Sequence, residues 1–223
     1  RFLAAIPDFL HPFPDGTRSY NEHQFAEKST VLPLGIHISG TADCKRSCAE
    51  APTILWNHRW EFDKAPEYFR NVLLDFKLQK VPFSLILTGE QFDSIPPSLL
   101  LMQKEFHQQI LHQGYAKSRE EYEGLLERSD FVIHSPKQEY FGISVLEAMS
   151  KGVIPILGEG TAYEDWCDES FITSNPSTIR ERFRSYAAKP APHRQLARQI
   201  AQRFDWDNVI PLYIEATNQV VNS

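Results

Sequence analysis

Two pairs of charged residues have the types and spacings needed to bind one anionic ligand. Arg59 and Lys64 follow the strand-like segment Thr53–Trp56, and a guanidinium fork together with an ammonium group suits phosphate oxygens. Glu139 and Glu147 stand before and inside a predicted helix, and carboxylates, which only accept hydrogen bonds, suit sugar hydroxyl groups. Together, the two pairs favour a ligand that carries both a diphosphate and sugar hydroxyls, as a nucleotide sugar does.

The start of that helix adds backbone groups to the same candidate site. Phe141 and Gly142 stand at the N-terminus of the predicted helix 141–151. N–H groups at this end of a helix bind anions, and a glycine lets a ligand approach the backbone closely. The neighbouring Tyr140 and Ile143 are counted with them as candidate ligand contacts.

A histidine and a tyrosine complete the candidate set. His58 adjoins Arg59 and could touch the phosphates or the sugar, whereas a lone histidine such as His134 is more often structural. Tyr115, which follows Gly114 at the end of a predicted strand, could pack against a base or equally well be a core aromatic residue.

The charged residues also have simpler structural interpretations. Arg59 could form a surface ion pair with Glu61 or Asp63, and Lys64 could be an ordinary residue near a helix N-terminus. Glu139 is interpreted as an acceptor for donor-sugar hydroxyls, and its competing role is that of a nucleophile.

Short apolar segments alternate with amphipathic segments from about residue 50 onward. The predicted strands are 53–56, 83–87, 110–111, 131–134 and 153–157, and the predicted helices are 65–79, 97–109, 118–128, 141–151, 176–187 and 190–203. This alternation predicts an α/β fold with a doubly wound, Rossmann-like parallel sheet of about six strands, covered by helices on both faces. Such sheets bind ligands beyond the carboxyl ends of their strands, which is where Arg59 and Glu139 fall.

The composition is that of a globular protein that is not basic as a whole. The chain has 223 residues, a net charge of −6 and a pI of about 5.8, whereas nucleic-acid-binding domains are commonly basic. No apolar run reaches the ~18–20 residues of a membrane helix, so we expect a cytoplasmic protein without a membrane partner. Cys44, Cys48 and Cys167 are expected to be reduced, and Cys44-x3-Cys48 lacks the second pair that a metal site would need.

The two charged motifs resemble those of a known enzyme family. Glu139–Leu157 is similar to the Glu-x7-Glu region of retaining GT-B glycosyltransferases, and Arg59-x4-Lys64 resembles the pair that these enzymes use on the donor diphosphate. The run Trp56–Glu67 is similar to the glycosyltransferases that mannosylate queuosine in tRNA. This likeness extends over about residues 50–170, through Leu87–Glu90, Gly114–Tyr115, Glu139–Gly142 and Tyr163–Asp165.

The resemblance implies a fold and a division of the chain. Residues 50–223 would form the C-terminal, nucleotide-sugar-binding half of a GT-B fold. Residues 1–49 would be a remnant of the acceptor-side domain followed by a linker, with the last strand of that domain at Thr30–Leu34. Since GT-B enzymes react in the cleft between two domains, this half alone is expected to be inactive.

The resemblance also implies the reaction and the roles of the residues. Arg59 and Lys64 would stabilise the leaving diphosphate, Glu139 would orient the donor sugar, and Glu147 would bind the ribose hydroxyls. The implied donor is GDP-mannose, a co-substrate rather than a cofactor, and the implied acceptor is queuosine in tRNA. No metal or cofactor is implied.

One segment reverses the acidic balance of the chain. Between Thr178 and Phe204 there is one acidic residue, Glu181, against seven basic ones: Arg180, Arg182, Arg184, Lys189, Arg194, Arg198 and Arg203. This stretch is interpreted either as the solvated face of two helices or as a contact for the tRNA backbone.

Three functions are open at this point. The first is the donor half of a tRNA-queuosine mannosyltransferase, and the second is a GT-B glycosyltransferase with another nucleotide sugar and a small-molecule or lipid acceptor. The third is a non-catalytic nucleotide-binding domain. Both cations and both carboxylates are present, which argues against the third because such a domain has no need of them.

Overall fold

The computed structural model describes residues 26–40, 43–91, 95–134 and 136–221. The chain divides into two compact units, one spanning Leu34–Val209 and one combining Arg1–Pro33 with Ile210–Ser223. Every candidate site residue lies in the larger unit.

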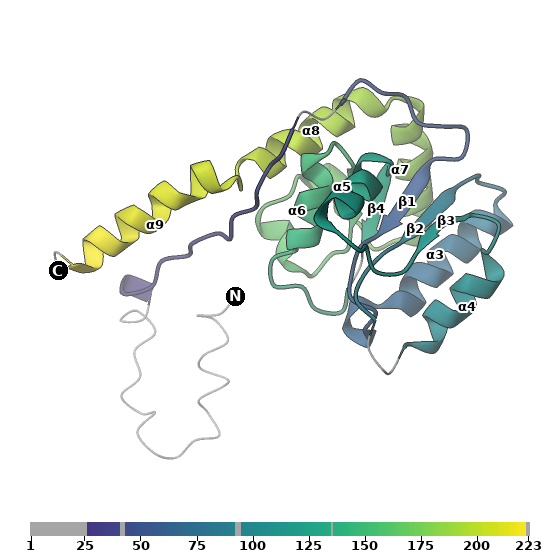
Figure 1. The fold of residues 1–223 in the computed structure, drawn as a ribbon, viewed down its shortest axis with the longest axis horizontal. Coiled ribbons are helices and arrows are strands. Elements are labelled where there is room, and N and C mark those ends of the chain that lie inside the picture. The colour runs from purple at the N-terminus through teal and green to yellow at the C-terminus, as the bar shows by residue number, and fades with distance from the viewer. Residues whose placement is uncertain (1–25, 41–42, 92–94, 135, 222–223) are drawn as a thin grey trace, which may run out of the picture. The chain divides into compact units, whose positions relative to one another are not determined.

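The larger unit is built on one parallel sheet of five strands in the order β3-β2-β1-β4-β5 (Figure 1). The strands are β1 (Thr53–Trp56), β2 (Ser84–Leu87), β3 (Ile110–Gln113), β4 (Phe131–His134) and β5 (Ile154–Leu157). The chain winds outward from β1 through β2 to β3 and then crosses to β4 on the other side of β1. The loops after β1 and β4 therefore diverge at the carboxyl edge, which is where sheets of this kind bind ligands.

The prediction of six strands is wrong by one. Beyond β5 the chain forms the short 3-10 helix η4 (Glu169–Phe171), and only Ile172 pairs with Leu157, as an isolated parallel bridge. The helical turn that ends at Phe171 leaves too little extended backbone there for a ladder of hydrogen bonds.

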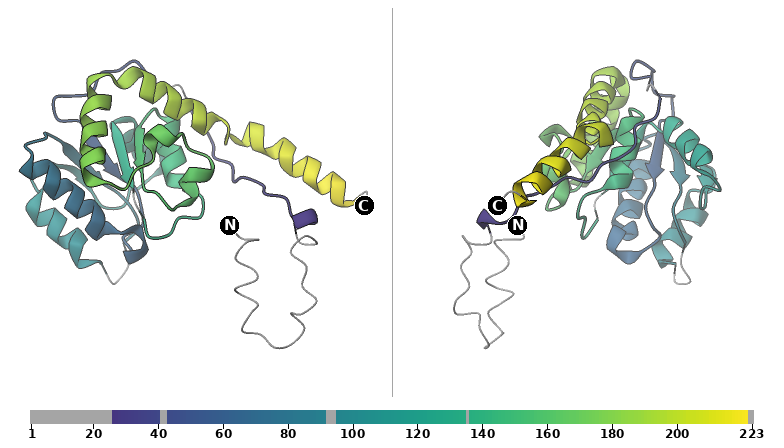
Figure 2. Two further views of the ribbon diagram at one scale, coloured as in Figure 1. Left: turned by 180° about the vertical axis from the view of Figure 1, so that it is seen from behind. Right: turned by 60° about the vertical axis from the view of Figure 1, so that its left-hand side comes forward.

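Helices cover both faces of the sheet (Figure 2). Helix α3 (Pro66–Leu78) packs against α4 (Pro97–Glu105) and α7 (Pro176–Ala188), whereas α6 (Ile143–Ser150) packs against α5 (Arg119–Glu127) and α8 (Pro190–Gln202). Right-handed crossovers that run in opposite directions from β1 place their helices on opposite faces. Since both faces are covered, β1, β4 and β5 are buried along their whole lengths.

The predicted helices differ from the observed ones mainly at their ends. The predicted helix 97–109 ends at Glu105, and the predicted helix 141–151 begins only at Ile143, because Gly142 takes a left-handed conformation with φ 92°. The remaining regular segments are η2 (Phe62–Lys64), η3 (Ala162–Asp165) and α9 (Trp206–Val221).

In the described residues 26–40 and 43–52, the segment before the sheet forms no strand. Residues 29–35 have no regular secondary structure, so the predicted strand Thr30–Leu34 is wrong. Pro33 in its middle has no backbone N–H to donate to a ladder. Ile36 instead forms an isolated bridge with Asp205, donating to Phe204 O at 2.7 Å and accepting from Trp206 N at 3.0 Å. Most of the predicted remnant, residues 1–25, lies outside the described residues.

The basic stretch on α7 and α8 mainly serves the fold. All six of its arginines donate to acceptors within the protein: Arg180 to Asp75, Arg182 to Ile172 O, Arg184 to Gln79 O, Arg194 to Asp130, Arg198 to Ser150 O and Arg203 to Trp166 O. Arg194 is fully buried, so the interpretation that it contacts tRNA is wrong. The cause is the carboxylate of Asp130, which is itself buried and which Arg194 neutralises.

Replacing Arg194 by methionine should lower the free energy of unfolding by about 3 kcal/mol, the lower end of the usual loss for a broken buried ion pair, because the buried Asp130 would keep only its longer contact with Arg46, at 3.6 Å. The matched control is Arg184→Met, since Arg184 is exposed and bonds only to Gln79 O at 3.1 Å. The control should change stability by no more than about 0.5 kcal/mol. Urea denaturation followed by tryptophan fluorescence measures both values, and equal losses would contradict the structural role given to Arg194.

Candidate functional site

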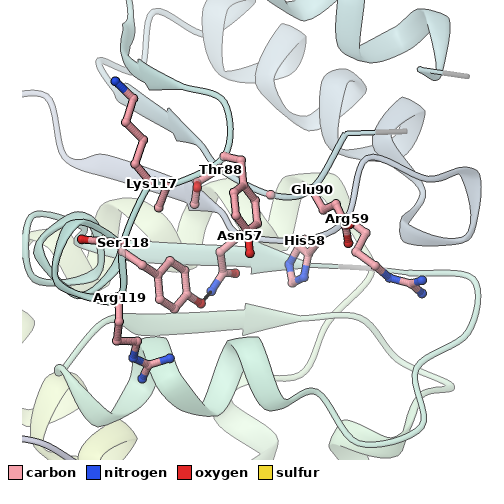
Figure 3. Close-up of a pocket in the computed structure, with 12 residues that line it drawn as sticks. Asn57, His58, Arg59, Thr88, Glu90, Lys117, Ser118 and Arg119 are labelled. Carbon is pink, nitrogen blue, oxygen red and sulfur yellow. Dashed lines mark hydrogen bonds between the residues drawn. The ribbon is translucent and has the colours of Figure 1, made fainter. Parts of the chain in front are cut away.

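Two adjoining cavities lie at the carboxyl edge of the sheet. One has a volume of about 470 Å³ and extends between the loops after β1, β2 and β3 (Figure 3). The other, of about 360 Å³, extends between the loops after β1 and β4. They share Asn57, His58 and Arg59, the three residues that follow β1. The loop after β1 is therefore common to both, and an elongated ligand could occupy both cavities.

A close approach between two loops fixes the backbone at Arg59. A Cβ atom on Gly89, in the loop after β2, would lie 1.9 Å from the carbonyl oxygen of His58, so only glycine fits there. Next to it, the backbone N–H of the fully buried Trp60 donates to Glu90 O at 2.9 Å. The backbone of Arg59 is thus held between His58 and Trp60, both of which contact the loop after β2.

The side chain of Arg59 lies at the surface. It is 53% exposed and forms an ion pair with Glu61 at 3.0 Å, as its simpler interpretation expected. Figure 3 shows Arg59 and Arg119 at opposite ends of the row of cavity residues. An exposed ion pair of this kind is weak, so a phosphate can replace Glu61 at small cost.

Lys64 and Glu139 meet, which joins the two charged motifs in space. Lys64 Nζ lies 3.2 Å from Glu139 Oε2 and 3.3 Å from Asp63 Oδ2, and the side chains of Lys64 and Glu139 are each only 13% exposed. The Glu139 carboxylate also accepts from its own loop, from Tyr140 N at 3.1 Å. The backbone of Asp63 accepts from Lys137 N at 2.9 Å, which ties the loop after β1 to the loop after β4.

Gly142 shapes the start of α6. It is the N-cap of the helix, and a Cβ atom on it would lie 2.4 Å from the ring of Tyr163. The carbonyl of Phe141 accepts from Trp166 Nε1 at 3.0 Å, so the turn before the helix is held from behind. The first turn of a helix leaves N–H groups without intrahelical partners, and Phe141, Gly142 and Ile143 all border the smaller cavity.

Glu147 lies one turn further along α6. Its Oε1 accepts from Arg119 Nη1 at 2.7 Å and its Oε2 from the Tyr122 hydroxyl at 3.0 Å. Tyr122 in turn accepts from Asn57 Nδ2 at 3.0 Å. Arg119, Tyr122 and Asn57 border the larger cavity, and they are not among the site residues that the sequence pattern predicted. No spacing signals them, because they meet only after β1, α5 and α6 have packed together.

His58 and His134 form a buried stack. Their ring centroids are 3.4 Å apart and their planes differ by 17°. His58 Nδ1 lies 3.1 Å from Ser144 Oγ, and His134 Nδ1 bonds to the Tyr163 hydroxyl. Burial, with the charge of Lys64 as a further cause, lowers the pKa of His58 to about 3, and burial also lowers the pKa of His134 well below its usual value. Both rings are therefore neutral near pH 7, and His58 brings no positive charge to the site.

The aromatic candidates differ in exposure. Tyr115 is 70% exposed and borders the larger cavity, so its alternative as a core residue is wrong. Gly114 before it has φ 114°, a conformation that turns the chain at the end of β3. Tyr140 is almost wholly exposed beside the smaller cavity.

The described part of the chain has neither a cluster of metal ligands nor a helix of membrane-spanning character. Among the described residues, no group of three or more His, Cys, Asp or Glu side chains could hold a metal ion. No helix there is long and apolar enough to cross a bilayer. Cys44 and Cys48 contact Arg194, the first as a donor to its carbonyl at 3.7 Å and the second through Sγ at 3.3 Å from Nη2.

Comparison with known proteins links this geometry to sugar transfer. The family model described as glycosyl transferases group 1 matches residues 46–202, well over half of the 223 residues. The tRNA-queuosine alpha-mannosyltransferase of Drosophila melanogaster is 24% identical over 98% of this chain and 61% of its own length. The GDP-mannose:cellobiosyl-diphosphopolyprenol alpha-mannosyltransferase of Xanthomonas oryzae is 26% identical over 73% of this chain and 46% of its length. The chain thus spans about half to three fifths of these relatives.

Solved structures confirm the fold class. Sucrose-phosphate synthase from Thermosynechococcus elongatus superposes with a TM-score of 0.69 at 16% identity, over 90% of this chain and 55% of that protein. Anabaena HepE in complex with UDP and glucose superposes with a TM-score of 0.67 at 18% identity, over 86% of this chain and 57% of that protein. The predicted Rossmann-like sheet is therefore that of a C-terminal GT-B domain. The chain belongs to the group 1 family of glycosyl transferases.

Proposed function

We propose that this domain binds the donor of a retaining mannosyltransferase that transfers mannose from GDP-mannose to queuosine in tRNA. The ion pair between Lys64 and Glu139, 3.2 Å long, is the observation that supports a sugar-nucleotide site most directly. A phosphate bound by Lys64 and a hydroxyl bound by Glu139 would be near neighbours, as they are in a sugar nucleotide. The pair borders the smaller cavity, which would hold the sugar and the diphosphate.

The proposed chemistry depends on the positive groups at this end of the sheet. Negative charge grows on the leaving diphosphate as the bond to the sugar breaks, and groups that bind this charge more tightly in the transition state lower the barrier. Arg59 can turn from Glu61 to the diphosphate, and Lys64 can exchange Glu139 for a phosphate oxygen. Backbone N–H groups at the start of α6 would add donors. Glu139 would keep the sugar oriented.

The nucleoside would occupy the larger cavity. Tyr115, exposed at its border, offers a ring on which a base can stack. Glu147 lies behind Arg119 and Tyr122 with 18% of its side chain exposed, and we assign it to the ribose hydroxyls.

The acceptor is inferred from the relatives and not from the basic stretch. The Drosophila relative, named for its action on tRNA-queuosine, aligns along nearly the whole chain. The arginines of α7 and α8 already have acceptors within the protein, so they carry no argument for tRNA. The acceptor would be bound by a second, acceptor-side domain.

A different nucleotide sugar with a small-molecule or lipid acceptor is the second candidate, and the similar proteins each favour one part of it. HepE is described with UDP and glucose, and the Xanthomonas relatives are named for a lipid-linked acceptor. Every base has a π face that Tyr115 can stack on, so base identity is a matter for titration. A non-catalytic domain is disfavoured, because the largely buried Lys64–Glu139 pair carries a desolvation cost that such a domain would have no need of.

Calorimetric titration of the chain with GDP, UDP and ADP should show the tightest binding for GDP. With GDP-mannose and tRNA that carries queuosine, the chain alone should transfer no sugar, because positioning of the acceptor, worth up to ~7–11 kcal/mol, is missing. Tightest binding of UDP would favour the second candidate. Failure of all three nucleotides to bind would contradict a nucleotide-sugar site.

Replacing Arg59 by alanine should lower sugar transfer by about 10²–10³, the usual loss when one group that stabilises transition-state charge is removed. The assay needs a protein that also carries the acceptor-side domain. Glu61→Gln is the matched control, because it removes the partner of Arg59 but keeps the cation, and it should leave transfer within about threefold of the starting protein. Unchanged turnover in Arg59→Ala would show that the diphosphate is bound elsewhere.

A further inference from the structure

The carboxylate of Glu147 is held from two sides by residues that the mechanism above does not use. Arg119 donates to one oxygen at 2.7 Å, and Tyr122 donates to the other at 3.0 Å. A carboxylate has about four acceptor positions, two on each oxygen. Among the described residues these are the donors to the two oxygens, which leaves one acceptor position open on each.

Tyr122 is itself fixed by a hydrogen bond. Its hydroxyl accepts from Asn57 Nδ2 at 3.0 Å, and the same amide group donates to Ser144 O at 2.8 Å. Asn57 therefore joins the end of β1 to the first turn of α6. Burial, and next the charge of Glu147, raise the pKa of Tyr122, so its hydroxyl stays protonated and directs its hydrogen at the carboxylate.

Arg119 is fixed from its other side, although its side chain is half exposed. Its Nε donates to Glu123 Oε1 at 2.9 Å. Glu123 Oε2 accepts from Ser39 Oγ at 2.7 Å and from Lys151 Nζ at 3.1 Å. The hydrogen bond from Ser39, with those from Arg119 and Lys151, lowers the pKa of Glu123 to about 2, so it remains ionised. Arg119 is thereby held by two carboxylates at once.

These two fixed donors have a specific consequence for Glu147. The last torsion of a glutamate side chain has broad, weak preferences, so only external hydrogen bonds can set the plane of its carboxylate. Arg119 and Tyr122 set that plane, and both border the larger cavity; Figure 3 labels Arg119.

We propose that Arg119 and Tyr122 are positioning residues that present the two open acceptor positions of Glu147 to the neighbouring 2′- and 3′-hydroxyl groups of the donor's ribose. The proposal rests on the proposed function, since it needs a nucleotide in the larger cavity. The proposal adds that the preference for ribose over deoxyribose depends on Arg119 and Tyr122, although neither of them accepts a hydrogen bond from the ribose hydroxyls.

The test compares affinity for a ribonucleotide with affinity for its 2′-deoxy analogue, using whichever of GDP, UDP and ADP binds best. The starting protein should prefer the ribonucleotide by about 10–100-fold, as expected for hydrogen bonds to a charged acceptor. In Tyr122→Phe this preference should fall to within about threefold of unity. The ring that packs under the Arg119 guanidinium at 5.4 Å is retained, so packing changes little.

Two further variants separate positioning from general damage. Tyr186 lies on α7, and its hydroxyl donates to Ser170 O at 2.7 Å. Tyr186→Phe removes this hydroxyl and should leave the ribose preference unchanged. Glu123→Gln changes no group on Glu147 but loosens Arg119, and it should reduce the preference by at least threefold even if Tyr122→Phe fails to fold.

The outcomes distinguish the two levels of the proposal. If the starting protein binds none of the three nucleotides, the proposed function fails and this inference fails with it. If the starting protein prefers the ribonucleotide and both Tyr122→Phe and Glu123→Gln keep that preference, the inference alone is overturned. Loss of preference in Tyr186→Phe as well would also overturn it, because the effect would then be unspecific.

Discussion

The carboxylate of Asp130 connects three parts of the fold at the amino end of the sheet. Its Oδ2 accepts from the backbone N–H of Thr53 at 2.9 Å, its own backbone N–H donates to Thr53 O at 2.8 Å, and its Oδ1 binds Arg194 of α8. These bonds set the register of β1 against β4. Because strands are stiff, this register also sets where the loops after β1 and β4 emerge at the opposite edge. The meeting of Lys64 with Glu139 depends on it.

The buried and the more exposed residues of the candidate site differ in charge. The stacked rings of His58 and His134 are neutral because burial disfavours their charged forms. Three cations of the site, Arg59, Lys64 and Arg119, are each paired with a carboxylate, whereas Lys117 borders the larger cavity as a further positive group. The site therefore has ion pairs around an uncharged pair of stacked rings. A ligand with a charged group and separate hydroxyl groups could exchange its own groups for the partners in these ion pairs.

The sequence predicted the parts of the fold that local patterns determine. Apolar runs identify β1 and β4 with their observed bounds, and the amphipathic segments between the runs place the helices to within a few residues. The sixth strand was predicted wrongly because a 3-10 turn competes with extended backbone at Phe171. The basic stretch was ambiguous for a different reason: a row of arginines in a sequence does not reveal that Asp130 and backbone carbonyls lie opposite them.

The candidate site was predicted in part. Arg59, Lys64, Glu139 and Gly142 could be selected because each follows a strand at the carboxyl edge. Asn57, Arg119 and Tyr122 could not, since their importance comes from hydrogen bonds between elements that are distant in sequence and from side-chain torsions that only packing determines. A sequence pattern predicts the residues that a ligand would touch. It is less able to predict the residues that hold those side chains in place.

The pairing of Lys64 with Glu139 has a consequence for how parts of a donor would add up. Each of these side chains is the counter-ion of the other, and both are shielded from water. A fragment such as inorganic phosphate would bind Lys64 and leave the Glu139 carboxylate without its cation. A free sugar would bind Glu139 and leave Lys64 with Asp63 as its remaining carboxylate. A molecule that carries both groups replaces both lost contacts in one event. The association constant of the intact donor should therefore exceed the product of the association constants of its pieces. The site would in this way distinguish a sugar that is covalently joined to a diphosphate from the two separate molecules.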